Sequence, residues 1–176
     1  GQDFESRVAG EFSWWSERIR QTFQATDSSV LFADFPAFAN QLFESFASPE
    51  LWQIRAGIPA LLRALKARGH PMAVLSNFDH RLPKPLESLG IEEFFEHILL
   101  PAEAGAAKPA RALFDLAAQR FDVPLDQLIY LGDDDASTLA AIAAHGICAL
   151  DIRVVERLSP LPDPIESIAT LASPNP

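Results

Sequence analysis

The chain has 176 residues, of which 48% are hydrophobic and 22% charged, a composition typical of globular proteins rather than disordered or fibrous ones. Acidic residues outnumber basic ones by 24 to 14, and no segment gathers Lys and Arg into a basic patch, which argues against nucleic acid as a partner. The single cysteine, Cys148, excludes an internal disulfide. No stretch has the ~18 apolar residues of a membrane span. We therefore expect a cytoplasmic protein without membrane contact.

Residues 1–54 are predicted to form a helical lobe. Apolar residues recur every three or four positions from Phe4 to Phe23, which indicates a long amphipathic helix. The same spacing returns from Phe35 to Phe46, where Pro36 suits a first helical turn. The lobe is rich in aromatic residues, and these need a partner surface, either the core of the same chain or a second molecule.

After this lobe, helices alternate with short apolar strands, which predicts a parallel sheet with crossover helices. We therefore expect an α/β domain with flanking helices over residues 55–176. The predicted strands are 72–75, 97–100, 128–131 and 147–150, and the predicted helices are 59–68, 81–89, 110–121, 137–145 and 164–171.

Three polar loops accompany these strands and helices. The first holds Ser76 and Asn77, the second Lys108, and the third Asp133 and Asp134. In open parallel sheets, ligands bind at the carboxyl ends of the strands. A hydroxyl, an amide and an ammonium group suit an anion, and clustered carboxylates suit a hard cation such as Mg²⁺.

Each loop also has an explanation that needs no ligand. Ser76 and Asn77 could cap a helix, and Lys108 could be a solvated charge. The acidic residues could cap the helix that follows them and complement its dipole. The order of the three loops along the chain is what favours one shared site.

In this order and at this spacing, the three loops resemble the second, third and fourth sequence motifs of the haloacid dehalogenase superfamily. The resemblance extends over residues 73–79 and 89–91, and the helical lobe resembles the cap that some members carry. It implies that Ser76 hydrogen-bonds phosphoryl oxygens, that Lys108 offsets negative charge and that Asp133 positions Mg²⁺. Ser76 and Lys108 would then be catalytic residues of a Mg²⁺-dependent, phosphatase-type hydrolase acting on a small phosphorylated or anionic ligand.

One motif of the superfamily is missing. The superfamily carries its nucleophile on a strand reading Asp-x-Asp ahead of the cap, whereas here the cap begins at the first residue. Asp34 ends an apolar run, but it lies inside the cap-like lobe and has no second acid two residues later, so we do not expect it to be the nucleophile. The fourth motif is also altered, because Thr138 stands where a common form has a further acid. Asp134 or Asp135 could replace that acid, as adjacent acids do in other family members, but the predicted metal site is weakened.

The missing strand belongs in the middle of the sheet, between the strands 72–75 and 128–131. Its absence leaves two inner edges with unpaired backbone groups, to be filled by residues outside this sequence, by a strand of another chain, or by direct closure. We expect self-association through this open sheet centre or through the aromatic cap.

Two functional hypotheses remain. The chain is either a piece of a phosphatase-like enzyme that is inactive as it stands, or a catalytically silent binding or assembly module of the same fold. A purely helical interaction protein is a weaker third hypothesis, because it leaves the three loops unexplained.

Overall fold

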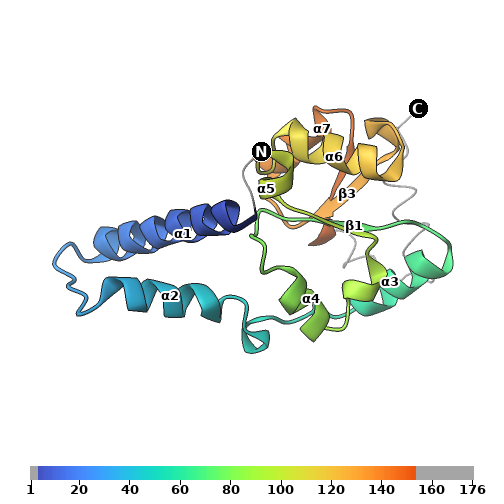
Figure 1. Ribbon diagram of the computed structural model, residues 1–176. Helices are drawn as coiled ribbons and strands as arrows, with labels where there is room; N and C mark the ends of the chain where they lie inside the picture. Colours follow the sequence, from blue (N-terminus) through green and yellow to red (C-terminus); the bar gives the residue numbers. More distant parts are fainter. Residues whose placement is uncertain (1–3, 154–176) are drawn as a thin grey trace.

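A computed structural model describes residues 4–153, and the predicted helix at 164–171 lies outside them. Figure 1 shows a helical hairpin beside an α/β part. The elements are α1 (Phe4–Thr26), α2 (Phe35–Ser45), η1 (Pro49–Leu51), α3 (Ile58–Ala67), β1 (Ala73–Leu75), α4 (Pro83–Ser88), η2 (Glu92–Phe94), β2 (His97–Leu99), α5 (Pro101–Ala104), α6 (Arg111–Phe121), η3 (Leu125–Gln127), β3 (Ile129–Gly132), α7 (Ala136–Ala143) and β4 (Cys148–Asp151).

The helical lobe is an antiparallel hairpin of α1 and α2 that extends away from the α/β part (Figure 1). Its seam is apolar because the spacing of three to four places apolar side chains on facing sides of the two helices. These are Ile19, Phe35, Phe38, Ala39 and Leu42, and Phe32 from the connecting loop packs against them. Both predicted helices of the lobe are confirmed. Among the described residues, no helix is long and apolar enough to cross a bilayer.

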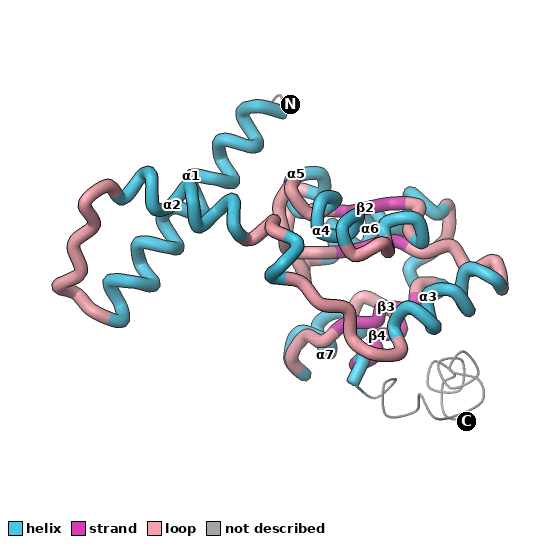
Figure 2. Tube along the Cα trace, turned by 90° about the horizontal axis from the view of Figure 1, so that it is seen from below, coloured by secondary structure: helices cyan, strands magenta, loops and turns pink. Residues whose placement is uncertain are grey.

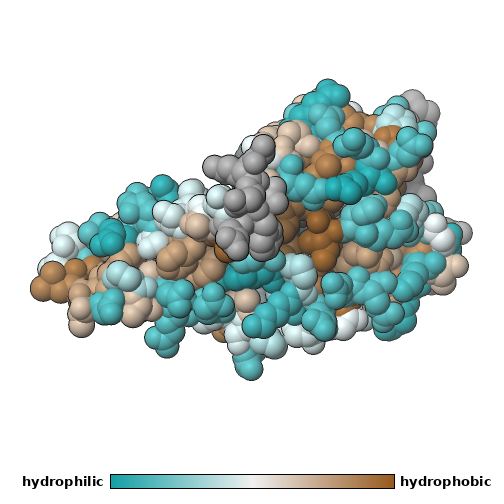
Figure 3. All heavy atoms as spheres, viewed as in Figure 1, coloured by the Kyte–Doolittle hydropathy of each residue, from teal (hydrophilic) through white to brown (hydrophobic). Residues whose placement is uncertain are grey.

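Apolar side chains also reach the surface of the lobe. Figure 3 shows them at the free end of the hairpin, where Leu31 is 94% exposed. Trp14 is exposed as well, whereas Trp15 stacks on Phe46. Trp52 lies edge-on against Phe78, with 5.6 Å between the ring centroids, so this tryptophan packs the lobe against the α/β part.

The α/β part holds two separate pairs of parallel strands. β1 pairs with β2, with Val74 opposite Ile98, and β3 pairs with β4, with Tyr130 opposite Ala149. In the part of the chain that the structure describes, no ladder joins β1 to β3, and Figure 2 shows the two pairs apart. The four predicted strands are confirmed, and direct closure of the sheet centre does not occur.

Helix α6 packs against both strand pairs. Leu113 and Ala117 are buried with Leu99 of β2, and Phe114 is buried with Tyr130 of β3. Leu75 of β1 contacts both groups. Burying side chains of this size is worth roughly 1.5–3 kcal/mol each, so the apolar contacts of α6 hold together two pairs that share no backbone ladder.

Two local differences from the predicted elements have physical causes. α4 begins at Pro83 rather than at residue 81, because Arg81 is fixed in a preceding turn by hydrogen bonds to the carboxylate of Asp79. α5 (Pro101–Ala104) was not predicted, since a helix of four residues is too short to show a period.

Asp34 is the N-cap of α2. Its carboxylate oxygen Oδ1 accepts a hydrogen bond from the backbone N–H of Ala37 at 3.0 Å, and the residue lies in a loop rather than a strand. We expect Asp34→Ala to lower the free energy of unfolding by about 1 kcal/mol, because a donor of the first turn loses its partner. Urea titration measures this change, with Glu44→Ala on the exposed surface of α2 as the control; equal stability of the two variants would contradict it.

Candidate functional site

The first predicted loop leaves the sheet at the carboxyl end of β1. The backbone N–H of Ser76 still donates to Leu99 O at 3.3 Å, so this residue continues the strand pairing. The hydroxyl of Ser76 accepts from the backbone N–H of Phe78 at 3.1 Å, which closes a tight turn. Asn77 therefore lies at the sheet edge with its side chain free to reach another loop.

Asn77 and Lys108 are joined by two hydrogen bonds. The backbone N–H of Lys108 donates to Asn77 Oδ1 at 2.7 Å, and Asn77 Nδ2 donates to the backbone oxygen of Lys108 at 3.2 Å. The two residues are 31 positions apart in the sequence. The side chain of Asn77 thus pairs with both backbone polar groups of Lys108 and fixes where the Lys108 side chain begins.

The ammonium group of Lys108 reaches the third predicted loop. Its Nζ lies 2.6 Å from the hydroxyl of Tyr130 and 3.3 Å from each carboxylate oxygen of Asp134. The Tyr130 hydroxyl in turn donates to Asp134 Oδ2 at 2.5 Å. The side chains of Lys108 and Asp134 are only 12% and 20% exposed. The structure thus brings Asn77, Lys108 and Asp134, three of the predicted site residues, to one edge of the sheet.

Tyr130 is held in a state in which it donates its proton. Burial raises the pKa of its hydroxyl, and the hydrogen bond to Asp134 and the negative charge of that carboxylate raise it further. The absence of a side chain at Gly132 makes room for this contact, since a Cβ there would lie 2.5 Å from the Tyr130 hydroxyl and 2.6 Å from Asp134 Oδ2.

The carboxylates of the third loop do not converge. Asp133 lies 3.6 Å from Arg55, and Asp134 faces Lys108. Asp135 caps α7 by accepting from the backbone N–H of Thr138 at 2.8 Å. Oxygen ligands suit Mg²⁺, but these three are turned to separate partners and, among the described residues, do not form a group of potential metal ligands. As arranged they do not fit a divalent cation, and the predicted Mg²⁺ stays a prediction.

Sequence reasoning missed several residues of this edge. Tyr130 looks like one more core residue of an apolar strand, and only its spacing of two from Gly132 hints at a shared face. Arg55 precedes α3, and Arg153, which donates to the backbone oxygen of Asp134 at 3.2 Å, follows β4. Neither arginine lies in a recognisable motif.

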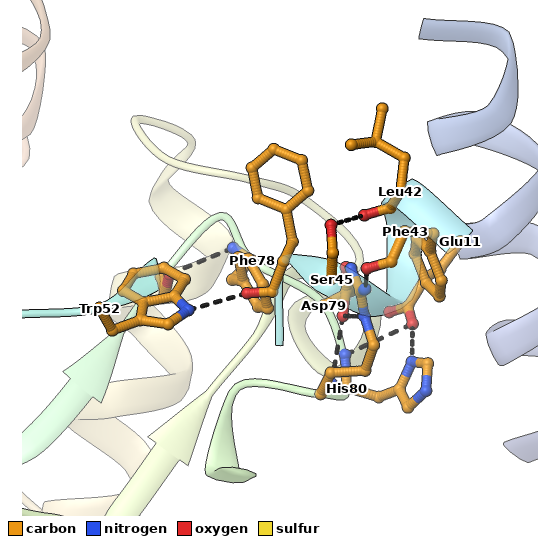
Figure 4. A network of polar contacts seen from close by, with 11 residues as sticks. Glu11, Leu42, Phe43, Ser45, Trp52, Phe78, Asp79 and His80 are labelled. Atoms are coloured by element: carbon orange, nitrogen blue, oxygen red, sulfur yellow. Dashed lines mark hydrogen bonds and ion pairs between the residues drawn. The ribbon is translucent and has the colours of Figure 1, made fainter. Parts of the chain in front are cut away.

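A second polar cluster joins the helical lobe to the loop after β1 (Figure 4). His80 Nδ1 lies 2.5 Å from a carboxylate oxygen of Glu11 in α1. Potential ligand atoms of Glu11, Asp79 and His80 lie within 4.8 Å of one another and could hold a metal ion. Both oxygens of Asp79, however, are bound by Arg81, and the guanidinium group opposes a cation there.

Asp79 and Arg81 are a buried ion pair, 3% and 8% exposed. Arg81 also donates to the backbone oxygen of Phe43 in α2 and lies over its ring at 3.3 Å. Burial raises the pKa of Asp79, but the hydrogen bonds and charge of Arg81 outweigh it, so the pKa is lowered overall. The pair therefore fastens the lobe to the α/β part.

Two open hollows, of about 370 and 320 Å³, flank His80. Val8 of α1 lines both, and Phe12 and Phe43 line the larger one. Neither is lined by Lys108 or Asp134, so these two hollows and the polar site lie apart.

Residues 2–146 match the family model of the haloacid dehalogenase-like hydrolases. The chain belongs to this family. The resemblance expected from the three loops is therefore confirmed, as is the α/β fold with parallel strands and flanking helices.

Among its relatives, the chain is 33% identical over 147 residues to haloacid dehalogenase-like hydrolase domain-containing protein 3 of Bos taurus, covering 84% of this chain and 58% of the relative. It is 26% identical over 157 residues to the 5-amino-6-(5-phospho-D-ribitylamino)uracil phosphatase of Escherichia coli (strain K12), covering 86% and 62%. A HAD family hydrolase from Deinococcus radiodurans R1, solved with bound phosphate and sodium, matches with a TM-score of 0.60 at 27% identity, covering 86% of this chain and 61% of that one. The chain thus spans less than two thirds of each of these proteins.

The buried ion pair makes a prediction for stability. Arg81→Met should cost about 3–5 kcal/mol, because it leaves the Asp79 carboxylate buried without a partner. Arg81→Met combined with Asp79→Leu should cost less, since no buried charge then remains. Urea titration of both variants measures the difference; a double variant less stable than the single one would contradict it.

The same pair should give a pH dependence of stability. Because the pKa of Asp79 is lower in the folded chain than its ordinary 3.8, its contribution is complete above that value and is lost as the pH falls through the folded pKa.

Proposed function

We propose that this chain carries the phosphate-binding site of a phosphatase-type haloacid dehalogenase-like hydrolase, and that as it stands it binds a small phosphorylated or anionic ligand without turning it over. One observation supports this above all. Asn77 and Lys108 are distant in the sequence, yet two hydrogen bonds join them at the carboxyl ends of the strands. Ser76, the neighbour of Asn77, adds a hydroxyl at the same edge.

The charge and burial of Lys108 support an anionic ligand. A largely buried ammonium group interacts more strongly with an anion than an exposed one, because less water screens it. Asn77 Nδ2 and the hydroxyl of Ser76 can add neutral hydrogen bonds. The relative from Deinococcus radiodurans was solved with phosphate, and the Escherichia coli relative is named as a phosphatase, which agrees with this ligand class.

The lack of turnover follows from the carboxylates of the described residues. Asp134 is bound by Lys108 and Tyr130, and Asp34 caps α2 in the helical lobe. No described strand lies between β1 and β3, so no described carboxylate approaches a bound phosphoryl group from the middle of the sheet. Groups for positioning and charge stabilisation are present, but none of the described residues supplies the attacking group.

A catalytically silent binding or assembly module is the alternative. It is favoured by the inner edges of β1 and β3, which pair with no further strand among the described residues. Exposed edge groups accept an extended segment by hydrogen bonding along the backbone. Figure 3 shows an apolar hollow in the place where Figure 1 draws β1 and β3, as a docking site for an apolar strand requires.

Loss of the ammonium group should weaken anion binding. We expect Lys108→Met to lower the affinity for inorganic phosphate at least about tenfold, since a hydrogen bond to a charged group is worth roughly 1.5–3 kcal/mol. Isothermal titration calorimetry measures this, with Lys84→Met on the exposed surface of α4 as a charge-matched control. Equal binding by both variants would contradict the proposal.

The same chain should not hydrolyse an aryl phosphate. Activity that survives Asp133→Asn but disappears with Asp34→Asn would show that Asp34 is a nucleophile after all.

The open sheet centre predicts association. We expect the chain to form oligomers or to take up an added strand, with protection of the β1 and β3 amides from hydrogen exchange that increases with protein concentration. Light scattering and hydrogen exchange measure the two effects together. A monomer at all concentrations, with β1 and β3 amides already fully protected, would mean that the centre is closed.

A further inference from the structure

We propose that Tyr130 is a positioning residue for Lys108, whose hydroxyl keeps the ammonium group from pairing fully with Asp134 and so keeps it available to an anion. This inference rests on the proposed anion site and names a residue that determines how strongly that site binds.

The distances show which partner holds Lys108. Its Nζ lies 2.6 Å from the Tyr130 hydroxyl but 3.3 Å from both oxygens of Asp134. Ammonium–carboxylate hydrogen bonds are commonly about 2.7–2.9 Å long, so the contact with Asp134 is a long one. The neutral hydroxyl, rather than the carboxylate, is the close partner of the charge.

The direction of the hydrogen bonds explains how the neutral Tyr130 hydroxyl can be the close partner of the ammonium group. The Tyr130 hydroxyl donates its only proton to Asp134, so its lone pairs face Lys108 and accept from it. The same bond partly satisfies the Asp134 carboxylate, which weakens its attraction for the ammonium group. A tyrosine whose proton is held by burial and by Asp134 remains in this donating state.

The surroundings of Tyr130 fix the hydroxyl in place. The ring is 9% exposed and lies edge-on against Phe114, with 5.7 Å between the centroids. Gly132, on the same face of β3, leaves the room that the hydroxyl occupies. At its other end Lys108 is fixed by Asn77, so both ends of the lysine side chain are held by groups of the fold.

Removing the hydroxyl should let Lys108 move onto Asp134. In Tyr130→Phe the ring packing is kept, but an incoming anion must then compete with a full ion pair. We expect the affinity for inorganic phosphate to fall about fivefold, the size expected for one hydrogen bond. In an Asp134→Asn background the competing charge is absent, so the same substitution should change the affinity less than about twofold.

The test is isothermal titration of the 176-residue chain with inorganic phosphate, for the single variants and the double variant Tyr130→Phe/Asp134→Asn. Ser45→Ala, which also removes one partly buried hydroxyl, is the control, and thermal unfolding checks that every variant is folded. A role limited to packing would give the same loss with and without Asp134, and that result overturns the inference.

A spectroscopic readout is available because Tyr130 is the only tyrosine in the chain. With ¹³Cζ-labelled tyrosine, its single NMR signal should shift when phosphate is added and should not shift in Lys108→Met. If the wild-type chain and Lys108→Met bind phosphate equally or not at all, the proposed function fails together with this inference. If only the wild type binds, while Tyr130→Phe matches it and the signal does not move, the inference alone is overturned.

Discussion

Lys108 connects the two strand pairs at the edge where the site is built. On the β1 side its backbone is held by Asn77, and on the β3 side its ammonium group contacts Tyr130 and Asp134. Apolar contacts of α6 join the same pairs below the surface. The position of the site therefore depends on one side chain that spans a discontinuous sheet.

In this arrangement the charges at the proposed site favour an anion over a cation. Each carboxylate of the third loop already has a partner, either a basic side chain or backbone N–H groups. A cation at Asp134 would have to displace Lys108, whereas an anion needs only to approach it. The chain as a whole is acidic, with 24 acidic against 14 basic residues, so the positive charge of Lys108 at this edge contrasts with the net charge of the chain.

The helical lobe is attached by a different kind of contact. Arg81 lies buried between Asp79 and the backbone of α2, and Glu11 of α1 reaches His80. Asp79, His80 and Arg81 follow Ser76 and Asn77 in the same loop, separated from them by Phe78 alone. The first residues of the loop after β1 thus belong to the site, and its last residues contact the lobe. We therefore expect a movement of the lobe to shift the site residues of this loop.

Most of the fold could be predicted from the sequence because periodicity reports burial directly. The helices of the lobe, the four strands and the three polar loops all follow from local patterns. The pairing of Lys108 with Tyr130 could not be predicted, since it depends on a strand side chain whose apolar neighbours suggest a core position.

The predicted metal site shows the same limit. Three successive aspartates suggest a cation site in the sequence, but the backbone turns each one towards a different partner. The contact between Glu11 and His80, 69 residues apart, likewise leaves no local signal.

An amide NMR titration with inorganic phosphate shows whether the Lys108 side chain joins both sides of the site. We expect the backbone signals of residues 76–77 and of residues 132–134 to move together, with one dissociation constant, and neither group to move in Lys108→Met. Movement of one loop alone, or of both loops in the variant, would contradict it.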